Sequence, residues 1–287
     1  MIFFLRPLFS CATMETKKQK FPENAKKSTK EGTDMKLGAQ FYTLRKRTQT
    51  KEGLEECFRA MSAIGYEAVQ MSAIGPVAPE DIRDMAEKYA LPVTCTHSPY
   101  DRIIGDTEKL IEEHKIYGCP VIGLGSMPGA YISSAEGVRA FIAESREAAK
   151  KIRAAGLRFA YHNHYKEFID VGGTDIFDIL FSEFPELDFI ADVYWMAYAG
   201  RDPLTYIRRI GRERMTNIHF KDMKSLPKGD ICPCGAGVLD FAAMARVCEE
   251  EGIETALVEQ DNAPDLGDEF EQMKFSYEHL RPLIKRK

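Results

Sequence analysis

The stretch Tyr161-His162-Asn163-His164 ends a largely apolar run that begins at Arg158. Three further runs also end in side chains that can bind a metal ion, in the stretches Ile190-Ala191-Asp192-Val193, Ile218-His219-Phe220-Lys221-Asp222 and Val258-Glu259-Gln260-Asp261. Short apolar runs of this kind are typical of buried parallel strands. Because the strand ends of a closed parallel barrel converge on one mouth, residues far apart in the sequence can share one ion there.

From Lys36 onward the chain repeats one pattern, an apolar or β-branched run followed by a segment with helical spacing. The eight runs are Leu37–Phe41, Ala68–Met71, Pro92–Thr96, Val121–Leu124, Arg158–Tyr161, Phe189–Val193, Asn217–Phe220 and Ala256–Val258. Between them apolar residues recur every three or four positions, and glycines such as Gly65 and Gly252 stand where helices would end. The last segment keeps this spacing from Phe270 to Ile284. The pattern predicts an α/β fold, a single-domain (β/α)8 TIM barrel over residues 35–287, rather than an open doubly wound sheet.

Residues 1–34 differ from the rest of the chain. They contain seven Lys or Arg and four acidic residues, few apolar residues after Cys11 and no periodicity, which predicts a disordered N-terminal extension. Met35 begins the first strand unit and is a candidate for the true start of translation. The opening run Ile2–Leu5 is too short to span a bilayer and is followed by Arg6-Pro7, so a signal peptide or anchor has little support.

Charge and cysteine content narrow the choice of partners and compartment. The chain has a formal charge of −5, and the +3 on residues 1–34 leaves −8 on residues 35–287. A domain this acidic lacks the basic surface that binds phosphates, so we do not expect nucleic acid as a partner. Because the opening apolar run is too short to span a bilayer, we do not expect a membrane as a partner either. The seven scattered cysteines suit reduced thiols in a cytoplasmic protein without structural disulfides. They are Cys11, Cys57, Cys95, Cys119, Cys232, Cys234 and Cys248.

Side chains at the ends of the last four runs form a candidate metal site. His162 and His164 alternate with other residues, so both point to the same side of their strand, and a structural hydrogen-bonded pair is the alternative. Asp192 lies within an apolar segment, where a carboxylate must be paired, protonated or bound to a cation. His219 and Lys221 share one face of their strand, and Glu259 ends the last run. An Asp, a Glu and two or more imidazoles suit Mn²⁺, Co²⁺, Zn²⁺ or Fe²⁺ better than Mg²⁺.

Two other motifs have simpler explanations. Gly235-Ala236-Gly237 begins a stretch that looks like a dinucleotide fingerprint, but it lacks the third glycine and follows a loop, so we expect a loop with Asp240 capping the next helix. Cys232-Pro-Cys234 has no second cysteine pair at zinc-site spacing and is expected to form a turn.

Taken together, these motifs resemble the sugar phosphate isomerase/epimerase superfamily of xylose isomerase-like barrels. The resemblance covers roughly residues 35–287. It rests on Leu-Gly-Ala-Gln-Phe-Tyr-Thr-Leu-Arg (37–45), Gly-Tyr-Glu-Ala-Val-Gln (65–70), Tyr-His-Asn-His (161–164), Asp-Val-Tyr-Trp (192–195), His-Phe-Lys-Asp (219–222), Gly-Ala-Gly-Val-Leu-Asp-Phe (235–241) and Val-Glu-Gln-Asp (258–261).

The resemblance implies one divalent metal ion and a sugar or keto-sugar substrate. The positions that match the family's ligands are His162, Asp192, His219 and Glu259. Such a metal acts as a Lewis acid on the carbonyl and adjacent hydroxyl and stabilises an enediolate, while a carboxylate takes the proton. Glu259 is then the candidate base, and His162 or His164 the candidate group on the other side. Lys221 is a candidate for neutralising charge on oxygen.

Four further residues are candidates for binding the substrate. Gln40, Gln70 and His97 lie near the ends of strands in the first half of the chain and could hydrogen-bond to hydroxyl groups. Trp195, the only tryptophan, could form an apolar wall for a sugar ring or pack in the core.

At His162 the sequence departs from the family's pattern, so several types of reaction stay under consideration. Where ketose epimerases of the family carry a glutamate as first ligand, this chain has His162, so epimerisation by two symmetrical carboxylates is in question. An isomerase or epimerase is the first interpretation, and a lyase or dehydratase acting on a keto-sugar or inosose is the second. A sugar-binding barrel without catalysis is the third, and an apurinic endonuclease ranks last because residues 35–287 are acidic. The oligomeric state stays open, a homo-oligomer included.

Overall fold

Eight parallel strands form the centre of the molecule. The computed structural model describes residues 35–284, so the predicted N-terminal extension lies outside the described residues. The strands are β1 (Lys36–Gln40), β2 (Ala68–Ser72), β3 (Val93–His97), β4 (Val121–Leu124), β5 (Arg158–His162), β6 (Leu187–Asp192), β7 (Met215–Phe220) and β10 (Thr255–Val258). Their order in the sheet is β3-β2-β1-β10-β7-β6-β5-β4, and the register is parallel throughout. All eight predicted strands are therefore confirmed.

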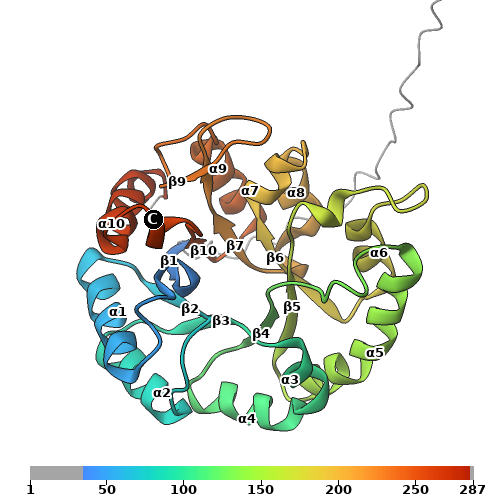
Figure 1. Ribbon diagram of the computed structural model, residues 1–287, viewed down its shortest axis with the longest axis horizontal. Helices are drawn as coiled ribbons and strands as arrows, with labels where there is room; N and C mark the ends of the chain where they lie inside the picture. Colours follow the sequence, from blue (N-terminus) through green and yellow to red (C-terminus); the bar gives the residue numbers. More distant parts are fainter. Residues whose placement is uncertain (1–34, 285–287) are drawn as a thin grey trace, which may run out of the picture. The chain divides into compact units, whose positions relative to one another are not determined.

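The sheet closes into a barrel, so its two end strands, β3 and β4, lie side by side (Figure 1). Just past β3, the N–H group of Ser98 donates a 2.8 Å hydrogen bond to the carbonyl of Gly123 in β4. A Cβ atom on Gly123 would lie 2.1 Å from the carbonyl oxygen of Thr96, so only glycine permits this approach. The predicted TIM barrel is confirmed, with its seam between β3 and β4.

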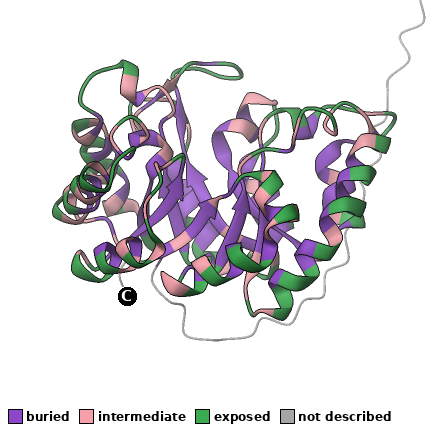
Figure 2. Ribbon diagram, turned by 60° about the horizontal axis from the view of Figure 1, so that its bottom comes forward, coloured by how far each residue is buried: buried purple, intermediate pink, exposed green. Residues whose placement is uncertain are grey.

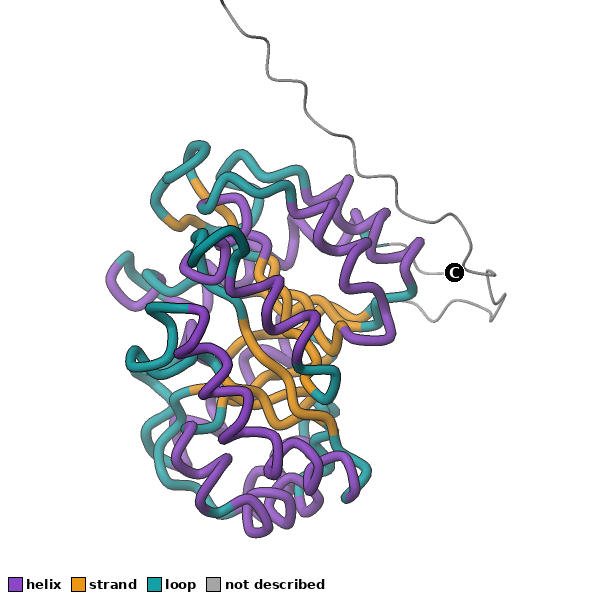
Figure 3. Tube along the Cα trace, turned by 90° about the vertical axis from the view of Figure 1, so that its right-hand side faces the viewer, coloured by secondary structure: helices purple, strands orange, loops and turns teal. Residues whose placement is uncertain are grey.

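Helices surround the strands of the barrel (Figure 3), and their exposed residues lie on the outside of the molecule (Figure 2). In α1 (Lys51–Ile64), Leu54, Phe58 and Met61 are buried, and the helix ends at Gly65, whose φ of 115° only glycine adopts readily. The other helices are α2 (Pro79–Lys88), α3 (Tyr100–Gly105), α4 (Thr107–Ile116), α5 (Ala135–Ala154), α6 (Ile176–Glu183), α7 (Val193–Tyr198), α8 (Pro203–Arg214), α9 (Phe241–Glu251) and α10 (Glu269–Leu280).

Several boundaries differ from those predicted. Phe41 begins a 3₁₀ helix (Phe41–Leu44), and Val193 begins α7, whose first turn is capped by Asp192. The terminal helix stops at Leu280 because Arg281-Pro282 follows, and a short 3₁₀ turn carries the chain on to Ile284. A two-stranded hairpin of β8 (Asp222–Met223) and β9 (Ile231–Cys232) was not predicted, because strands of two residues leave no periodicity to detect.

The inside of the barrel changes from apolar to polar along the strands. A buried cluster of Cys95, Val121, Ala160 and Ile190 fills the middle of the barrel. In β6, Ile190 belongs to this inner cluster, whereas Phe189 and Ala191 pack in the core outside it. Since side chains alternate along a strand, Asp192 points to the same side as Ile190, two residues further toward the mouth. An apolar floor thus lies beneath the polar residues of the mouth.

Two predictions from composition can be compared with the described part of the chain. The six cysteines between residues 35 and 284 are buried free thiols, while Cys11 lies outside the described residues. Among the helices of residues 35–284, none is both long and apolar enough to cross a membrane.

Candidate metal centre

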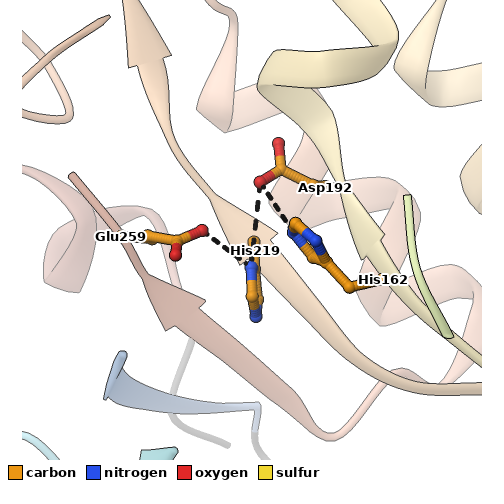
Figure 4. Close-up of side chains that lie close together, drawn as sticks. All are labelled: His162, Asp192, His219 and Glu259. Atoms are coloured by element: carbon orange, nitrogen blue, oxygen red, sulfur yellow. Dashed lines mark hydrogen bonds and ion pairs between the residues drawn. The ribbon is translucent and has the colours of Figure 1, made fainter. Parts of the chain in front are cut away.

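Four side chains meet at the carboxyl ends of neighbouring strands. His162 ends β5, Asp192 ends β6, His219 lies in β7 and Glu259 follows β10. Each offers one potential ligand atom, and these atoms lie within 4.8 Å of one another (Figure 4). All four side chains are buried. The structure thus brings together the four residues predicted as ligands, and the group could hold a metal ion.

His162 is held in one orientation by the backbone. Its Nδ1 atom lies 3.1 Å from the carbonyl oxygen of Gly125, which can only accept a hydrogen bond, so Nδ1 carries the proton. Its Nε2 atom lies 3.2 Å from Oδ2 of Asp192. A neutral imidazole and a carboxylate would place two lone pairs against each other here. A cation between them, either a proton or a metal ion, removes this repulsion.

His219 is held in a similar way by a side chain. Its Nε2 atom lies 2.7 Å from Oε1 of Gln70, and its Nδ1 atom lies 3.0 Å from Oε2 of Glu259 and 3.7 Å from Oδ2 of Asp192. Burial opposes the charged imidazolium, but Glu259 and Asp192 outweigh it and raise the pKa of His219 to about 9. Both imidazoles thus use their outer nitrogen for positioning and direct the inner nitrogen toward the carboxylates, as metal-binding histidines do.

Lys221 supplies positive charge beside the four residues. Its ammonium lies 2.7 Å from Oδ1 of Asp261, 3.3 Å from Oε2 of Glu259 and 3.7 Å from Oδ2 of Asp192, and its side chain is 1% exposed. Burial would raise the pKa of Glu259, but Lys221 and His219 outweigh it and hold that pKa well below its usual value. The same kind of balance, with Lys221 as the main cation, lowers the pKa of Asp192. Both carboxylates are therefore ionised and able to bind a cation.

A cavity of about 450 Å³ opens above this group. His162, His164, Lys221 and Glu259 line it together with His97. The His164 ring lies 4.8 Å from the His162 ring, and burial, with smaller effects of His162 and Lys221, lowers the pKa of His164 to about 3, so its imidazole is neutral. We call this space the central cavity. It is large enough for a small sugar.

Two other residues predicted to bind the substrate, His97 and Trp195, lie near the candidate ligands. His97 is near the ligands, with its ring 5.1 Å from that of His162, and its Nδ1 atom lies 3.1 Å from the hydroxyl of Ser72. Trp195 is half-buried, its ring 5.2 Å from that of His164 and also 5.2 Å from the Lys221 ammonium. It is not among the residues that line the central cavity, and it packs against Tyr165, Tyr194 and Tyr198.

Gln40 and Gln70 are fully buried at the mouth. Gln70 accepts from His219, and Gln40 Oε1 accepts a 3.1 Å hydrogen bond from the N–H group of Tyr42. The structure therefore places Gln70 as a support for a candidate ligand. The Nε2 atoms of both glutamines and of His97 are buried without a hydrogen-bond partner among the described residues. Of these three predicted substrate-binding residues, only His97 lines the central cavity. Buried polar atoms normally have a hydrogen-bond partner, so these unpaired atoms are exceptions.

Other supporting residues were not predicted from the sequence. The side-chain amide of Asn163 clamps the backbone of Asp192, accepting from its N–H group at 2.9 Å and donating to its carbonyl at 3.2 Å. Glu167 is fully buried, accepts from the hydroxyl of Tyr161 and accepts at 2.8 Å from the N–H group of His164. Both fix the turn after β5. Their sequence signal was the clustering of polar residues around the two histidines.

Asp222 organises the loop after β7. Its buried carboxylate accepts hydrogen bonds from the N–H groups of Met223, Gly235, Gly237 and Leu239, at 2.8 to 3.1 Å. A Cβ atom on Gly237 would lie 2.4 Å from Oδ1 of Asp222, so glycine is required for this close contact. The predicted cap of α9 by Asp240 is confirmed. The Gly-Ala-Gly stretch is thus a loop held on a carboxylate, as its weak match to a nucleotide motif suggested.

Known proteins with this architecture were compared with the chain. The family model described as xylose isomerase-like TIM barrel matches residues 58–283. A sugar phosphate isomerase/epimerase from Parabacteroides distasonis has a TM-score of 0.73 at 21% identity, covering 92% of this chain and 100% of that one. A search of curated proteins found no match.

Two other similar structures carry different activities in their descriptions. A structure of L-ribulose 3-epimerase has a TM-score of 0.66 at 13% identity, covering 87% of this chain and 95% of that one. A probable 3-DHS dehydratase involved in petrobactin synthesis, from Bacillus anthracis, has a TM-score of 0.68 at 12% identity, covering 88% and 100%. Identities this low establish a shared fold and leave the reaction open. Because the family model spans most of the described barrel, the chain belongs to the family of xylose isomerase-like TIM barrels.

Proposed function

We propose that the protein is a divalent-metal-dependent isomerase or epimerase of a sugar or keto-sugar that removes a proton next to a carbonyl group. The observation that carries this proposal is the meeting of two carboxylates and two oriented imidazoles beneath a cavity of sugar size. A metal ion held by His162, Asp192, His219 and Glu259 would act as a Lewis acid that polarises the substrate carbonyl. The mixed oxygen and nitrogen set supports Mn²⁺, Co²⁺, Zn²⁺ or Fe²⁺ rather than Mg²⁺.

Glu259 is the proposed base. It lines the central cavity, and the contacts recorded for its carboxylate, with His219 and Lys221, use Oε2. This leaves Oε1 as the oxygen that can accept a proton from the substrate. Lys221 keeps Glu259 ionised, which maintains the base in its reactive form. A positioned base of this kind contributes about a hundredfold or more to the rate.

His164 is the proposed partner on the other side of the substrate. Both nitrogens of His162 are occupied, one by Gly125 and one by Asp192, whereas the contacts recorded for the His164 ring are with the rings of His162 and Trp195. His164 also lines the central cavity, so its nitrogens are available to exchange a proton with a substrate hydroxyl. This favours His164 over His162 for proton transfer and leaves His162 as a ligand.

A lyase or dehydratase acting on a keto-sugar or inosose is the second candidate. It is supported by His162, because the resemblance described above implies a glutamate at this position in ketose epimerases of the family. With one carboxylate and a free imidazole, the site can remove a proton on one side and assist a leaving hydroxyl on the other.

The test begins with metal analysis of the purified protein, followed by incubation of the metal-loaded protein with a panel of ketoses in deuterated water. The panel contains D-fructose, D-tagatose, D-allulose, L-sorbose and the keto-inositol inosose. We expect about one transition-metal ion per chain and deuterium at a carbon next to the carbonyl of at least one compound. An isomer or epimer as product supports the first candidate, and an unsaturated product absorbing in the ultraviolet supports the second. Binding without any exchange would leave a sugar-binding barrel.

A further inference from the structure

A chain of buried hydroxyl groups leads from the central cavity to a buried histidine. Ser98 lines the cavity, and its Oγ atom lies 3.0 Å from Oγ1 of Thr96. Thr96 Oγ1 lies 2.9 Å from Nε2 of His114 in α4. The three residues are 8%, 5% and 1% exposed. They also line a second cavity of about 360 Å³, which shares His97 and Ser98 with the central cavity. The backbone of Ser98 is fixed by its hydrogen bond to Gly123 at the barrel seam.

His114, at the far end of this series of hydrogen bonds, determines which group is the donor in each of them. Nδ1 of His114 lies 2.7 Å from the carbonyl oxygen of Leu110, which can only accept, so Nδ1 carries the proton. The hydroxyl oxygen of Tyr117, 3.0 Å from the same nitrogen, can share this proton as a second acceptor. Burial lowers the pKa of His114 to about 4, so the ring is neutral and its Nε2 atom is an acceptor.

The donor and acceptor roles of Thr96 and Ser98 follow from the protonation state of His114. Because Nε2 of His114 accepts, Thr96 donates its hydroxyl proton to it. Thr96 can therefore only accept from Ser98, and Ser98 donates its own proton away from the cavity. What Ser98 presents to the cavity is its lone pairs alone.

We propose that Ser98 is a specificity-determining residue that accepts a hydrogen bond from a hydroxyl group of the sugar and rejects a carbonyl or ether oxygen at that position. The inference rests on the proposed function, because it assigns a substrate contact in the same cavity. A buried acceptor left without a donor discriminates strongly between a hydroxyl and a group that cannot donate. Ser98 thus restricts which carbons of the substrate can carry the keto group.

The donor and acceptor roles in this series of hydrogen bonds are measured first, without any substrate. The full-length protein, labelled with ¹⁵N-histidine and loaded with diamagnetic Zn²⁺, is studied by long-range ¹H–¹⁵N correlation, with Thr96→Ser used to assign the His114 signals by their shift. We expect a proton on Nδ1 and an unprotonated Nε2 for His114. A proton on Nε2, or on both nitrogens, would overturn the inference, because Thr96 would then accept and Ser98 could donate.

The consequence for binding is measured by calorimetry on the metal-loaded protein. The probes are the tightest-binding ketose of the panel and its derivatives in which fluorine replaces one hydroxyl, since fluorine cannot donate. At one carbon we expect fluorine to raise Kd roughly tenfold in the wild type. The increase should disappear in Ser98→Ala. It should shrink in Thr96→Val, which frees the Ser98 proton, and persist in the matched control Thr96→Ser.

The outcomes separate the two proposals. If a ketose exchanges deuterium but no fluorine effect depends on Ser98, or if Thr96→Val and Thr96→Ser behave alike, this inference is overturned and the proposed function stands. If no ketose of the panel binds, the proposed function is overturned, and this inference with it.

Discussion

Gln70 and His219 form a buried hydrogen bond at the mouth of the barrel, with Gln70 Oε1 2.7 Å from His219 Nε2. The carboxamide oxygen can only accept, so the bond places the proton of a neutral His219 on Nε2. This leaves Nδ1 free to face Glu259 and Asp192. A residue that touches neither carboxylate in this arrangement thus decides which nitrogen of His219 is offered to a metal ion.

Gln70→Leu should weaken metal binding by about tenfold or more, because the supporting contact of a metal-binding histidine is typically worth 10–100-fold in affinity. The variant leaves His219 Nε2–H buried without an acceptor. Gln70→Glu, which retains an acceptor, is the matched control and should keep most of the affinity. Competition with a fluorescent chelator measures both. Equal affinity in Gln70→Leu and the wild type would show that Gln70 does not orient His219.

Glu259→Gln should keep the fold, since the side chain is nearly isosteric, and lower deuterium exchange into the substrate by at least about a hundredfold. The amide lacks both the charge that holds a metal ion and the lone pair that accepts the proton. Glu254→Gln, on the exposed residue just before the same strand, is the control and should behave as the wild type. His162→Gln should lose metal affinity but keep part of the exchange at saturating metal. The reverse pattern would assign the base to the strand of His162.

The metal-free protein should lose stability as the pH rises from about 6.5 to about 9. The pKa of His219 is raised to about 9 by Glu259 and Asp192 against the effect of burial, so its charged form stabilises the fold below pH 6.5. That contribution disappears as the pH passes through 9. Metal affinity should increase over the same range, because binding releases this proton. Thermal unfolding of chelator-treated protein from pH 6 to 9.5 tests this, and His219→Gln should flatten the slope. A wild-type curve without slope would contradict it.

Asp222→Asn should destabilise the protein by on the order of 3 kcal/mol, because an amide nitrogen would face backbone N–H groups that now share a buried carboxylate. Asp240→Asn in the same loop is the matched control. Asparagine is as good a helix cap as aspartate, so we expect little change there. Urea unfolding followed by circular dichroism compares the two. Similar free energies of unfolding for both variants would mean that Asp222 does not hold the loop.

Deletion of residues 1–34 should leave the unfolding temperature unchanged within error. These residues have no periodicity and no core-forming stretch, whereas Met35, the first described residue, is already buried. Differential scanning calorimetry of the full-length and shortened proteins provides the comparison. A large loss of stability would show that the N-terminal residues pack against the barrel.

The sequence predicts the barrel well because its signals are local. Buried parallel strands appear as apolar runs, and helix ends appear as glycines such as Gly65, so neither depends on knowing the tertiary contacts. The four candidate ligands were also predictable, since His162, Asp192, His219 and Glu259 each follow such a run. Topology then brings the strand ends together.

The contacts that position these candidate ligands could not be predicted, because they join segments that are distant in the sequence. Gly125 orients His162 through a carbonyl oxygen, which every residue has and which leaves no trace in the sequence. Gln70 reaches His219 from a strand that is not its neighbour in the sheet. The hydrogen bonds from Ser98 through Thr96 to His114 join the end of β3 to α4 through ordinary hydroxyl groups. Gln70 was predicted as a site residue, but only the three-dimensional structure shows which groups these residues contact.

The alternation of side chains within β6 links the packing of the core to the position of Asp192. The register that packs Phe189 and Ala191 outside the barrel is the same register that turns Asp192 inward, and a slip of one residue would exchange the two sides. A substitution that keeps this packing therefore also keeps Asp192 at the mouth of the barrel. The contacts that stabilise the core on one side of β6 thus also hold a candidate ligand in place on the other.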